Sequence, residues 1–450
     1  MSSKKRRNNP SASPRTAHNA ARHSAARRTA FCLQLPAEKL RAAITRVRSL
    51  LSVRRNRIIA AAAGSAVVFA AAAGIAAAVW RASVLSVAFY QVPEAVISEV
   101  TVLLQKTIPK KIKADILNPE KELTRRTAAS HDLLITWQGA PLATTAAAAV
   151  IPEDRIYSLL PTPLRAAGAA VRQDGARYTV PLLLDHFELA YYRTLRKEVN
   201  AEIPATLQEL ESYLQSIQPS IDTPLFCAGA DDRTLLGLVS VLYESMYGSA
   251  KYRNLIARLS DGAAGGTGTA DARITALAPV IQKLRQWQQD RLIHPKWYKA
   301  TERDVNTFIK DRRPGVLFMT LSEHRTKSLL HIKYFDASRF PAQEGSPAEH
   351  ALIAPAVTAT AYNAKKDTLA ALEQLLLSDA QSSLSTQSRL APASSRAQSH
   401  DLQADDVRYW AASCAGGAVP DLGLAVCTTA AALHELAERI RIELEQEQSQ

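Results

Sequence analysis

Polar and aromatic side chains recur where apolar, strand-like segments of this chain end. In an open α/β sheet, ligands bind beside the carboxyl ends of the strands, so these side chains are candidates for a binding site. An aromatic face can stack on the C–H surface of a sugar, while carboxylates accept hydrogen bonds from its hydroxyl groups. These strand-end residues are therefore the candidates for contact with a small ligand. They are Tyr90, Gln91, Trp137, Asp185 and Glu323.

Two of these residues also admit a purely structural interpretation. A tryptophan at the end of a strand is often part of a core, which applies to Trp137. An aspartate ahead of a helix often caps its first turn, which applies to Asp185. Both interpretations stay open at this point.

Motifs for catalysis or metal binding are lacking in the sequence. His434-Glu435 is not followed by the second histidine of a zinc-protease motif. Ser322, His324 and Lys327 are close in sequence, but closeness along a strand end does not orient a base against a nucleophile. We therefore predict no catalytic residue, no metal ligand and no cofactor, and we expect the protein not to be an enzyme.

The candidate residues lie in a chain that alternates between strand-like and helix-like segments. Parallel strands need a crossover of a dozen or more residues, and a helical segment beginning at Pro93 separates the first two strands. This alternation predicts a doubly wound α/β fold. The expected strands are 84–89, 112–117, 132–137, 316–321 and 331–335, and two later helices are expected at 234–247 and 274–290.

The segment from Asp174 to Leu210 carries the most specific pattern. It begins with Asp174-Gly175, continues through Tyr178 and Val180-Pro181, and leads to a helix start. There Thr206 and Glu209 have the spacing of a capping box, in which each side chain bonds a backbone amide at the helix start.

These segments, taken in order, resemble the extracellular solute-binding proteins of ABC importers, in the group that includes maltose- and other sugar-binding proteins. The resemblance covers nearly all of residues 84–450 and implies a two-lobed periplasmic-binding-protein fold of type II. It implies capture of a small solute, with a sugar as the first expectation, and ABC permease subunits as partners. The matching segments are 84–106, 132–140, 174–181, 204–210, 304–320 and 369–392.

The same resemblance adds Trp410, which stands where sugar-binding members often present an aromatic platform; an ordinary core position is the alternative. The sequence departs from the family at Arg193, which follows Tyr192 where members usually carry asparagine. The strand near residue 320 also lacks the glycine and tryptophan that often follow it. The ligand itself is therefore left open.

Charge is concentrated at the start of the chain. The 450 residues carry a formal net charge of +13, yet fifteen lysines and arginines precede residue 58 against the single acid Glu38. The rest of the chain is close to neutral, which argues against a nucleic-acid-binding domain. We expect residues 1–57 to be a largely disordered basic tail, with an amphipathic helix over 37–51 on anionic lipid.

Residues 58–80 contain no charge and are rich in alanine. A helix of this length spans roughly 35 Å, enough to cross a bilayer core of about 30 Å. The positive flank predicts a cytoplasmic N-terminus in a bacterial inner membrane, with residues 81–450 in the periplasm or outside the cell. A cleaved signal peptide is the alternative, although the apolar run is long and many residues precede it.

Four cysteines fit an exported domain. Cys414 and Cys427 are close enough in sequence for a disulfide in an oxidising compartment, with two buried thiols as the alternative.

The sequence thus predicts a tethered, two-lobed solute-binding domain. We expect the first lobe to comprise residues 84–183 and 343–382, and the second lobe residues 184–342 and 383–450. A tethered sensor or scaffold that keeps the fold without transport is the alternative function.

Overall fold

The computed structural model describes residues 83–160, 176–263, 270–311, 314–327, 333–342, 350–394, 396–399, 401–414 and 417–446. The chain divides into two compact units, Met1–Arg81 and Ala82–Gln450, and the strands and helices of the described part belong to the second unit. The basic tail, the predicted membrane span over 58–80 and Asp174-Gly175 all lie outside the described residues. None of the helices in the described part is long and apolar enough to cross a membrane.

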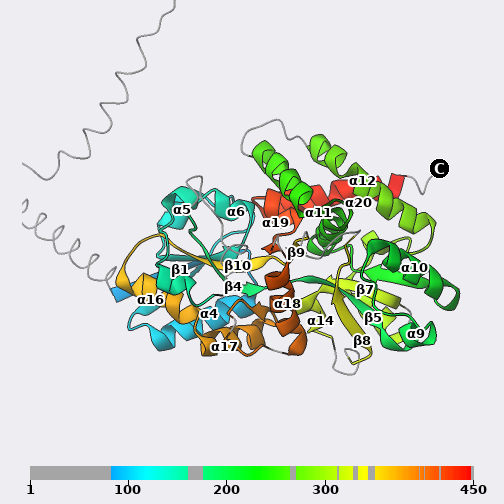
Figure 1. Ribbon diagram of the computed structural model, residues 1–450. Helices are drawn as coiled ribbons and strands as arrows, with labels where there is room; N and C mark the ends of the chain where they lie inside the picture. Colours follow the sequence, from blue (N-terminus) through cyan, green and yellow to red (C-terminus); the bar gives the residue numbers. More distant parts are fainter. Residues whose placement is uncertain are drawn as a thin grey trace, which may run out of the picture. The chain divides into compact units, whose positions relative to one another are not determined.

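A mixed six-stranded sheet forms the centre of what we call the first lobe (Figure 1). The three N-terminal strands pair in parallel, as the sequence predicted. Three later strands extend the sheet, each antiparallel to the strand beside it, so that β10 pairs with β3, β4 with β10 and β11 with β4. In sheet order the strands are β11 (Ala391–Pro392), β4 (Val180–Leu184), β10 (Ala356–Ala361), β3 (Leu133–Trp137), β1 (Val84–Tyr90) and β2 (Lys111–Ile116).

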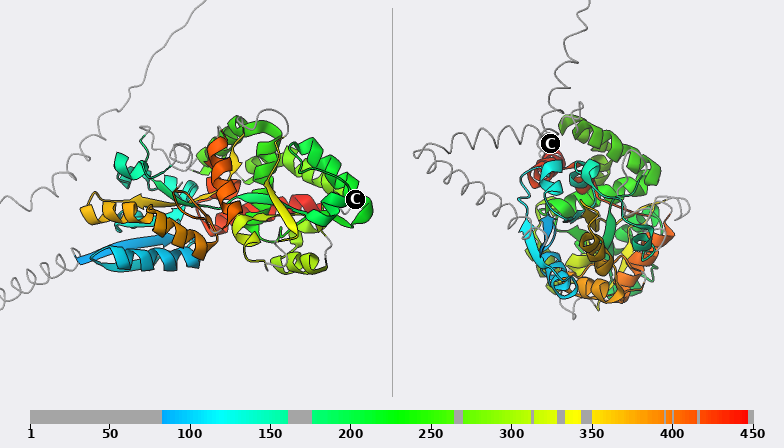
Figure 2. Two further views of the ribbon diagram at one scale, coloured as in Figure 1. Left: turned by 60° about the horizontal axis from the view of Figure 1, so that its bottom comes forward. Right: turned by 90° about the vertical axis from the view of Figure 1, so that its left-hand side faces the viewer.

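Apolar residues at helical spacing pack α4 (Glu94–Thr107) against this sheet, with Val96, Val100 and Leu104 fully buried. Two helices from much later in the chain, α16 (Lys366–Leu375) and α17 (Ser378–Ser388), lie beside α4. Figure 2 shows the blue and orange segments side by side. The core of the first lobe therefore joins segments from both ends of the domain.

A four-stranded sheet forms the centre of the second lobe. Its strands, in sheet order, are β6 (Thr223–Cys227), β7 (Pro314–Thr320), β5 (Phe187–Tyr192) and β8 (Phe335–Arg339). Alternating side chains of these strands feed two apolar clusters, one on each face. The helices packed around the sheet are α9 (Arg193–Glu198), α10 (Leu207–Ile217), α11 (Asp232–Ala263), α12 (Ala270–Gln289), α13 (Glu302–Asp311) and α20 (Ala430–Gln446).

Short helices and strands join these larger elements. In the first lobe they are α5 (Arg125–Ala129), α6 (Ala140–Ala143), η1 (Ala146–Ala148) and α7 (Asp154–Tyr157). Later in the chain they are η2 (Gln218–Ser220), η3 (Trp297–Lys299), α14 (Leu321–His324), β9 (Leu352–Ile353), α18 (Leu402–Ser413), β12 (Ala418–Val419) and α19 (Leu422–Val426).

The chain first passes from the six-stranded sheet to the four-stranded sheet at residues 185–186, between β4 and β5. The expected return at residue 383 differs from the structure. Leu384 of α17, Ala391 of β11 and Val407 of α18 are all buried in the apolar cluster of the first lobe. The chain rejoins the second lobe only at α19 and α20, because the apolar residues there face α11 and α12.

Three smaller differences concern element bounds. The strand expected at 331–335 is β8, which occupies Phe335–Arg339. The helix expected at 234–247 extends over α11 and is interrupted at Gly248, whose φ of 80° lies outside the helical region. The helix expected at 274–290 is α12, which starts four residues earlier and ends one residue earlier.

The predicted capping box at the start of α10 is present. The Thr206 hydroxyl accepts a hydrogen bond from the Glu209 amide at 3.1 Å, and the Glu209 carboxylate accepts one from the Thr206 amide at 3.2 Å. We expect Thr206→Ala to lower the free energy of unfolding by about 1 kcal/mol, since one amide loses its partner. Denaturant titration of both proteins measures the difference. Thr307→Ala, at an exposed position of α13, is the matched control, and an equal loss in both variants would contradict the assignment.

Candidate functional site

Trp137 and Asp185, both predicted site residues, are brought together by Arg233. The Arg233 guanidinium carbon lies 4.2 Å from the centroid of the Trp137 ring. Its Nη2 atom lies 3.4 Å from Oδ2 of Asp185. Trp137 ends β3 of the first lobe, Asp185 lies at the crossing, and Arg233 stands in the first turn of α11 in the second lobe. One cation therefore connects both lobes and the crossing.

The Asp185 carboxylate is completely shielded from solvent and has a second partner. Ser322, in α14, donates its amide to Oδ1 at 3.1 Å and its hydroxyl to Oδ2 at 2.8 Å. Burial raises the pKa of Asp185, and Arg233 and Ser322 oppose that shift. The helix-cap interpretation of Asp185 therefore gives way to a bridge between the crossing and the second lobe.

A second buried carboxylate, Asp421, belongs to the same surroundings. Its Oδ1 accepts the Leu424 amide at 3.1 Å and caps α19. Its Oδ2 makes no hydrogen bond within the described part of the chain. Burial raises the pKa of Asp421, and the positive charge of Arg233 opposes this most strongly. We call Trp137, Asp185, Arg233, Ser322 and Asp421 the inter-lobe junction.

Local backbone geometry holds the two lobes close at the junction. Gly139 has a φ of 142°, and a Cβ atom there would collide with the Leu424 carbonyl oxygen. Only glycine allows α6, which follows β3, to approach α19 this closely. Asp231 caps α11 by accepting the amide and the hydroxyl of Thr234, which fixes the first turn that carries Arg233. Figure 1 shows α19 between α6 and α11.

A buried polar network lies beside the junction, centred on Glu188 of β5. His324 and His186 both contact its carboxylate, and Gln403 of α18 donates to both its oxygens at 2.9 and 3.0 Å. Although burial favours protonation of Glu188, the two imidazoles hold its pKa well below the usual range. Trp410, a predicted platform, is half-buried, and its ring centroid lies 5.2 Å from that of His186 at 61°. Trp410 thus contacts the residue next to Asp185.

The other predicted site residues lie in different surroundings. The Tyr90 hydroxyl donates to the Thr428 carbonyl at 2.8 Å, and the Gln91 amide donates to the Tyr90 hydroxyl at 3.0 Å. These two residues fasten the first lobe to the segment between α19 and α20. Burial raises the pKa of Tyr90 to about 12, so its hydroxyl stays protonated.

Glu323 lies next to Ser322 in α14, with Lys327 3.5 Å away. Burial raises the pKa of Glu323 to about 7, Lys327 opposes the shift, and the nearby charges of Glu302 and Asp231 add to it. It is therefore a carboxyl group that changes charge near neutral pH, at the edge of the junction.

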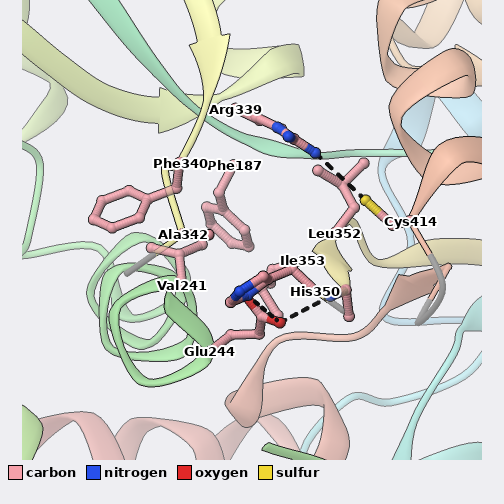
Figure 3. Close-up of a pocket in the computed structure, with 11 residues that line it drawn as sticks. Phe187, Val241, Glu244, Arg339, Phe340, Ala342, His350, Leu352, Ile353 and Cys414 are labelled. Carbon is pink, nitrogen blue, oxygen red and sulfur yellow. Dashed lines mark hydrogen bonds and ion pairs between the residues drawn. The ribbon is translucent and has the colours of Figure 1, made fainter. Parts of the chain in front are cut away.

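A small cavity of about 30 Å³, partly open to solvent, lies between α11, β8, β9 and the end of α18 (Figure 3). Glu244 accepts the Ala351 amide at 2.8 Å and faces Nδ1 of His350 at 3.1 Å. Arg339 points to the Cys414 sulfur at 3.6 Å. The polar side chains of the pocket thus contact one another, and the remaining walls are apolar. The lining residues are Phe187, Val241, Glu244, Arg339, Phe340, Ala342, His350, Ala351, Leu352, Ile353 and Cys414.

Within the described residues, Asp232, His434 and Glu438 form a group with the composition of a metal site. Arg441 already contacts two of them, at 2.7 Å from Asp232 and 2.5 Å from Glu438. Its guanidinium supplies the positive charge that these carboxylates need.

Solved structures with the same architecture are solute receptors. The bacterial solute receptor AcbH, which prefers β-D-galactopyranose, matches with a TM-score of 0.61 and 14% identity over 81% of this chain and 97% of that chain. A sugar transporter protein of Bacillus licheniformis, in complex with stachyose, matches with a TM-score of 0.56 and 12% identity over 81% and 99%. The fold is that of the solute-binding proteins.

The GacH receptor of Streptomyces glaucescens, solved with and without acarbose, also has this solute-binding-protein fold, with a TM-score of 0.51 and 17% identity over 81% of this chain and 94% of that chain. No protein-family model and no curated protein matches the sequence. The likeness therefore lies in the fold, as the order of segments in the sequence predicted.

Cys414, Cys427 and Arg193 lie outside the inter-lobe junction. Cys414 and Cys427 are both free and buried, so the structure has the alternative of two buried thiols and not the disulfide. Cys414 is buried in the apolar cluster of the first lobe and Cys427 in that of the second. Arg193, the departure from the family pattern, pairs with Asp336 of β8 at 2.7 Å, at the opposite end of β5 from Asp185.

Sequence reasoning missed Arg233, Asp421 and Glu188. Arg233 could have been selected, because it follows the carboxyl end of β6 by a few residues. Residues at the carboxyl ends of strands were the candidates, and Trp137 was chosen on that ground. Asp421 gave no such signal, since it follows a two-residue strand. Glu188 lies inside a strand, where a carboxylate is not expected to face a core.

The raised pKa of Glu323 makes folding stability depend on pH. Its pKa of about 7 in the folded protein exceeds the ordinary value of 4.5, so the folded state holds this proton more tightly than the unfolded state. The contribution of protonated Glu323 to the free energy of unfolding is therefore fully present below the ordinary pKa. It is lost as the pH rises through about 7. Above this pH we expect the free energy of unfolding of Glu323→Gln to exceed that of the wild type by up to about 3 kcal/mol. The variant should therefore unfold at a higher denaturant concentration.

Denaturant titrations between acidic and mildly alkaline pH measure this difference. Glu198→Gln, at an exposed position of α9, is the control and should give a pH-independent difference. If the free energy of unfolding of Glu323→Gln varied with pH in parallel with that of the wild type, the raised pKa of Glu323 would be contradicted.

Proposed function

We propose that residues 81–450 form a solute-binding domain that captures a small solute, with carbohydrate as the first class, between its two lobes. The observation that carries the proposal is the inter-lobe junction. It brings an aromatic face of the first lobe, a carboxylate at the crossing and a cation of the second lobe to one place. A solute that contacts all three favours the arrangement in which the lobes are close.

The fold of the solved receptors supports the choice of carbohydrate. AcbH, the Bacillus licheniformis protein and GacH are described with galactopyranose, stachyose and acarbose, respectively. A tryptophan face combined with carboxylates suits such ligands, since a sugar ring offers both a C–H surface and hydroxyl groups. We propose no catalytic step, and we assign Trp137 and Asp185 to solute contact.

We extend the proposal to location and partners. Residues 58–80 would anchor the domain in the cytoplasmic membrane, with the basic tail inside and the domain in the periplasm or outside the cell. Closed lobes would present a composite surface to an ABC permease. A tethered binder gives up diffusional reach and gains a high local concentration beside its permease.

The test is solute binding by the full-length chain in detergent, using galactose, stachyose and acarbose. We expect at least one of them to raise the unfolding temperature and to bind in a calorimetric titration. Trp137→Leu and Asp185→Asn should each weaken that binding at least about tenfold, because each removes a contact to the solute. Tyr409→Ala and Asp290→Asn, both exposed, are the matched controls and should bind as the wild type does.

Two results would count against the proposal. Unchanged binding by both junction variants would place the solute elsewhere in the domain. No response to any sugar would indicate a domain that keeps the fold without capturing carbohydrate.

A further inference from the structure

Resting on the proposed function, we infer that the captured solute carries a cationic group, as an amino sugar does, and that Arg233 is an internal cation occupying the place of that group. The class of solute and the role of Arg233 both follow from the contacts that its guanidinium makes.

The Arg233 guanidinium lies where a ligand cation would bind best. It stacks over the Trp137 ring at 4.2 Å and lies 3.4 Å from the Asp185 carboxylate. An aromatic face and a buried carboxylate together are the usual partners of a bound ammonium or guanidinium group. With Arg233 in place, the Trp137 face is covered, so a solute that stacks there must displace the side chain.

The charges at the junction decide what can replace Arg233. Asp185 and Asp421 are both fully buried, and the positive charge of Arg233 is the largest electrostatic influence that favours their charged forms. Lys327, the cation beside Glu323, already contacts Glu302 at 3.0 Å. A neutral sugar that displaced Arg233 would leave two buried carboxylates without their arginine, so each would have to take up a proton or stay charged at a high cost. A solute with its own positive charge restores the balance.

Arg233 is held loosely enough to be displaced. Its side chain is 26% exposed and stands in the first turn of α11, where rotation about its side-chain bonds can carry it toward solvent. Its Nε and Nη2 atoms make no hydrogen bond to any described residue. Stacking and a long ion pair are therefore its main attachments, and both are available to an incoming cation.

The opposite arrangement would keep Arg233 in place as a donor to a neutral or acidic solute. In that case the solute would need a different aromatic face, because the guanidinium covers Trp137. The two arrangements predict opposite effects of removing Arg233, so one substitution separates them. Removal strengthens binding of a cationic solute if Arg233 competes with it, and weakens binding if Arg233 is a contact.

The experiment compares sugar pairs that differ only in an ammonium group. Glucosamine is paired with glucose, galactosamine with galactose, and the disaccharide of β-1,4-linked glucosamine with cellobiose. Calorimetric titration at about pH 6 keeps the amino group protonated. We expect the amino sugar of at least one pair to bind the full-length chain at least about tenfold tighter than its neutral partner. We expect Arg233→Ala to tighten that binding about tenfold further.

Arg258→Ala, an exposed arginine on the same helix, removes an equal charge and should leave the affinities unchanged. Arg233→Gln, which keeps a long polar side chain without the charge, serves as a second variant, and circular dichroism checks that both variants are folded. A neutral partner that binds as tightly as its amino sugar overturns the inference and leaves solute capture intact. Weaker binding of the amino sugar by both Arg233 variants also overturns it. Absence of binding by every pair in every folded variant overturns the inference together with carbohydrate capture.

Discussion

The buried carboxylate of Asp185 is the point on which the two lobes depend. It lies where the chain leaves β4 for β5, at the first crossing between the two sheets. A buried carboxylate is costly unless its neighbours supply hydrogen bonds and positive charge. Ser322 and Arg233, both from the second lobe, supply them. The first crossing is therefore fastened to the second lobe by electrostatics rather than by apolar packing.

Apolar packing explains why polar groups gather at this place. The largest apolar clusters lie on the two sheets, where strand and helix side chains interlock. Between them stand Asp185, His186, Glu188, His324 and Asp421, all buried. Such a polar zone between two apolar cores adds little to stability, since ion pairs there only offset their own desolvation. Its hydrogen bonds and ion pairs can fix how the two lobes meet, and under the proposed function they offer partners to a polar solute.

The sequence predicted the architecture better than the site. Alternation of apolar runs gave the parallel strands β1, β2 and β3, because strand and helix periods are local properties. The capping box at Thr206 was also local and is present. The return of the chain between the lobes was misplaced, since the packing of α17 and α18 on the first lobe depends on contacts far apart in sequence.

The difference between local patterns and contacts far apart in sequence also explains which site residues the sequence predicted. Trp137 and Asp185 could be selected because strand ends are visible in the sequence, but the cation between them comes from a helix start about fifty residues further along the chain. Pairing of charges across a fold cannot be deduced from spacing. For the same reason, spacing could not decide between a disulfide and two buried thiols, because Cys414 and Cys427 are close in sequence and belong to different cores.

Entry of a solute requires the lobes to separate, because the junction is closed in this structure. Trp137 is 4% exposed and Asp185 is 1% exposed, so neither can contact a solute from outside. Opening also separates the Gly139 backbone from the Leu424 carbonyl, where α6 touches α19. Separation of Arg233 from Asp185 leaves a buried carboxylate without its arginine, which is costly unless another group supplies positive charge or hydrogen bonds. Under the proposed function, the solute supplies those groups.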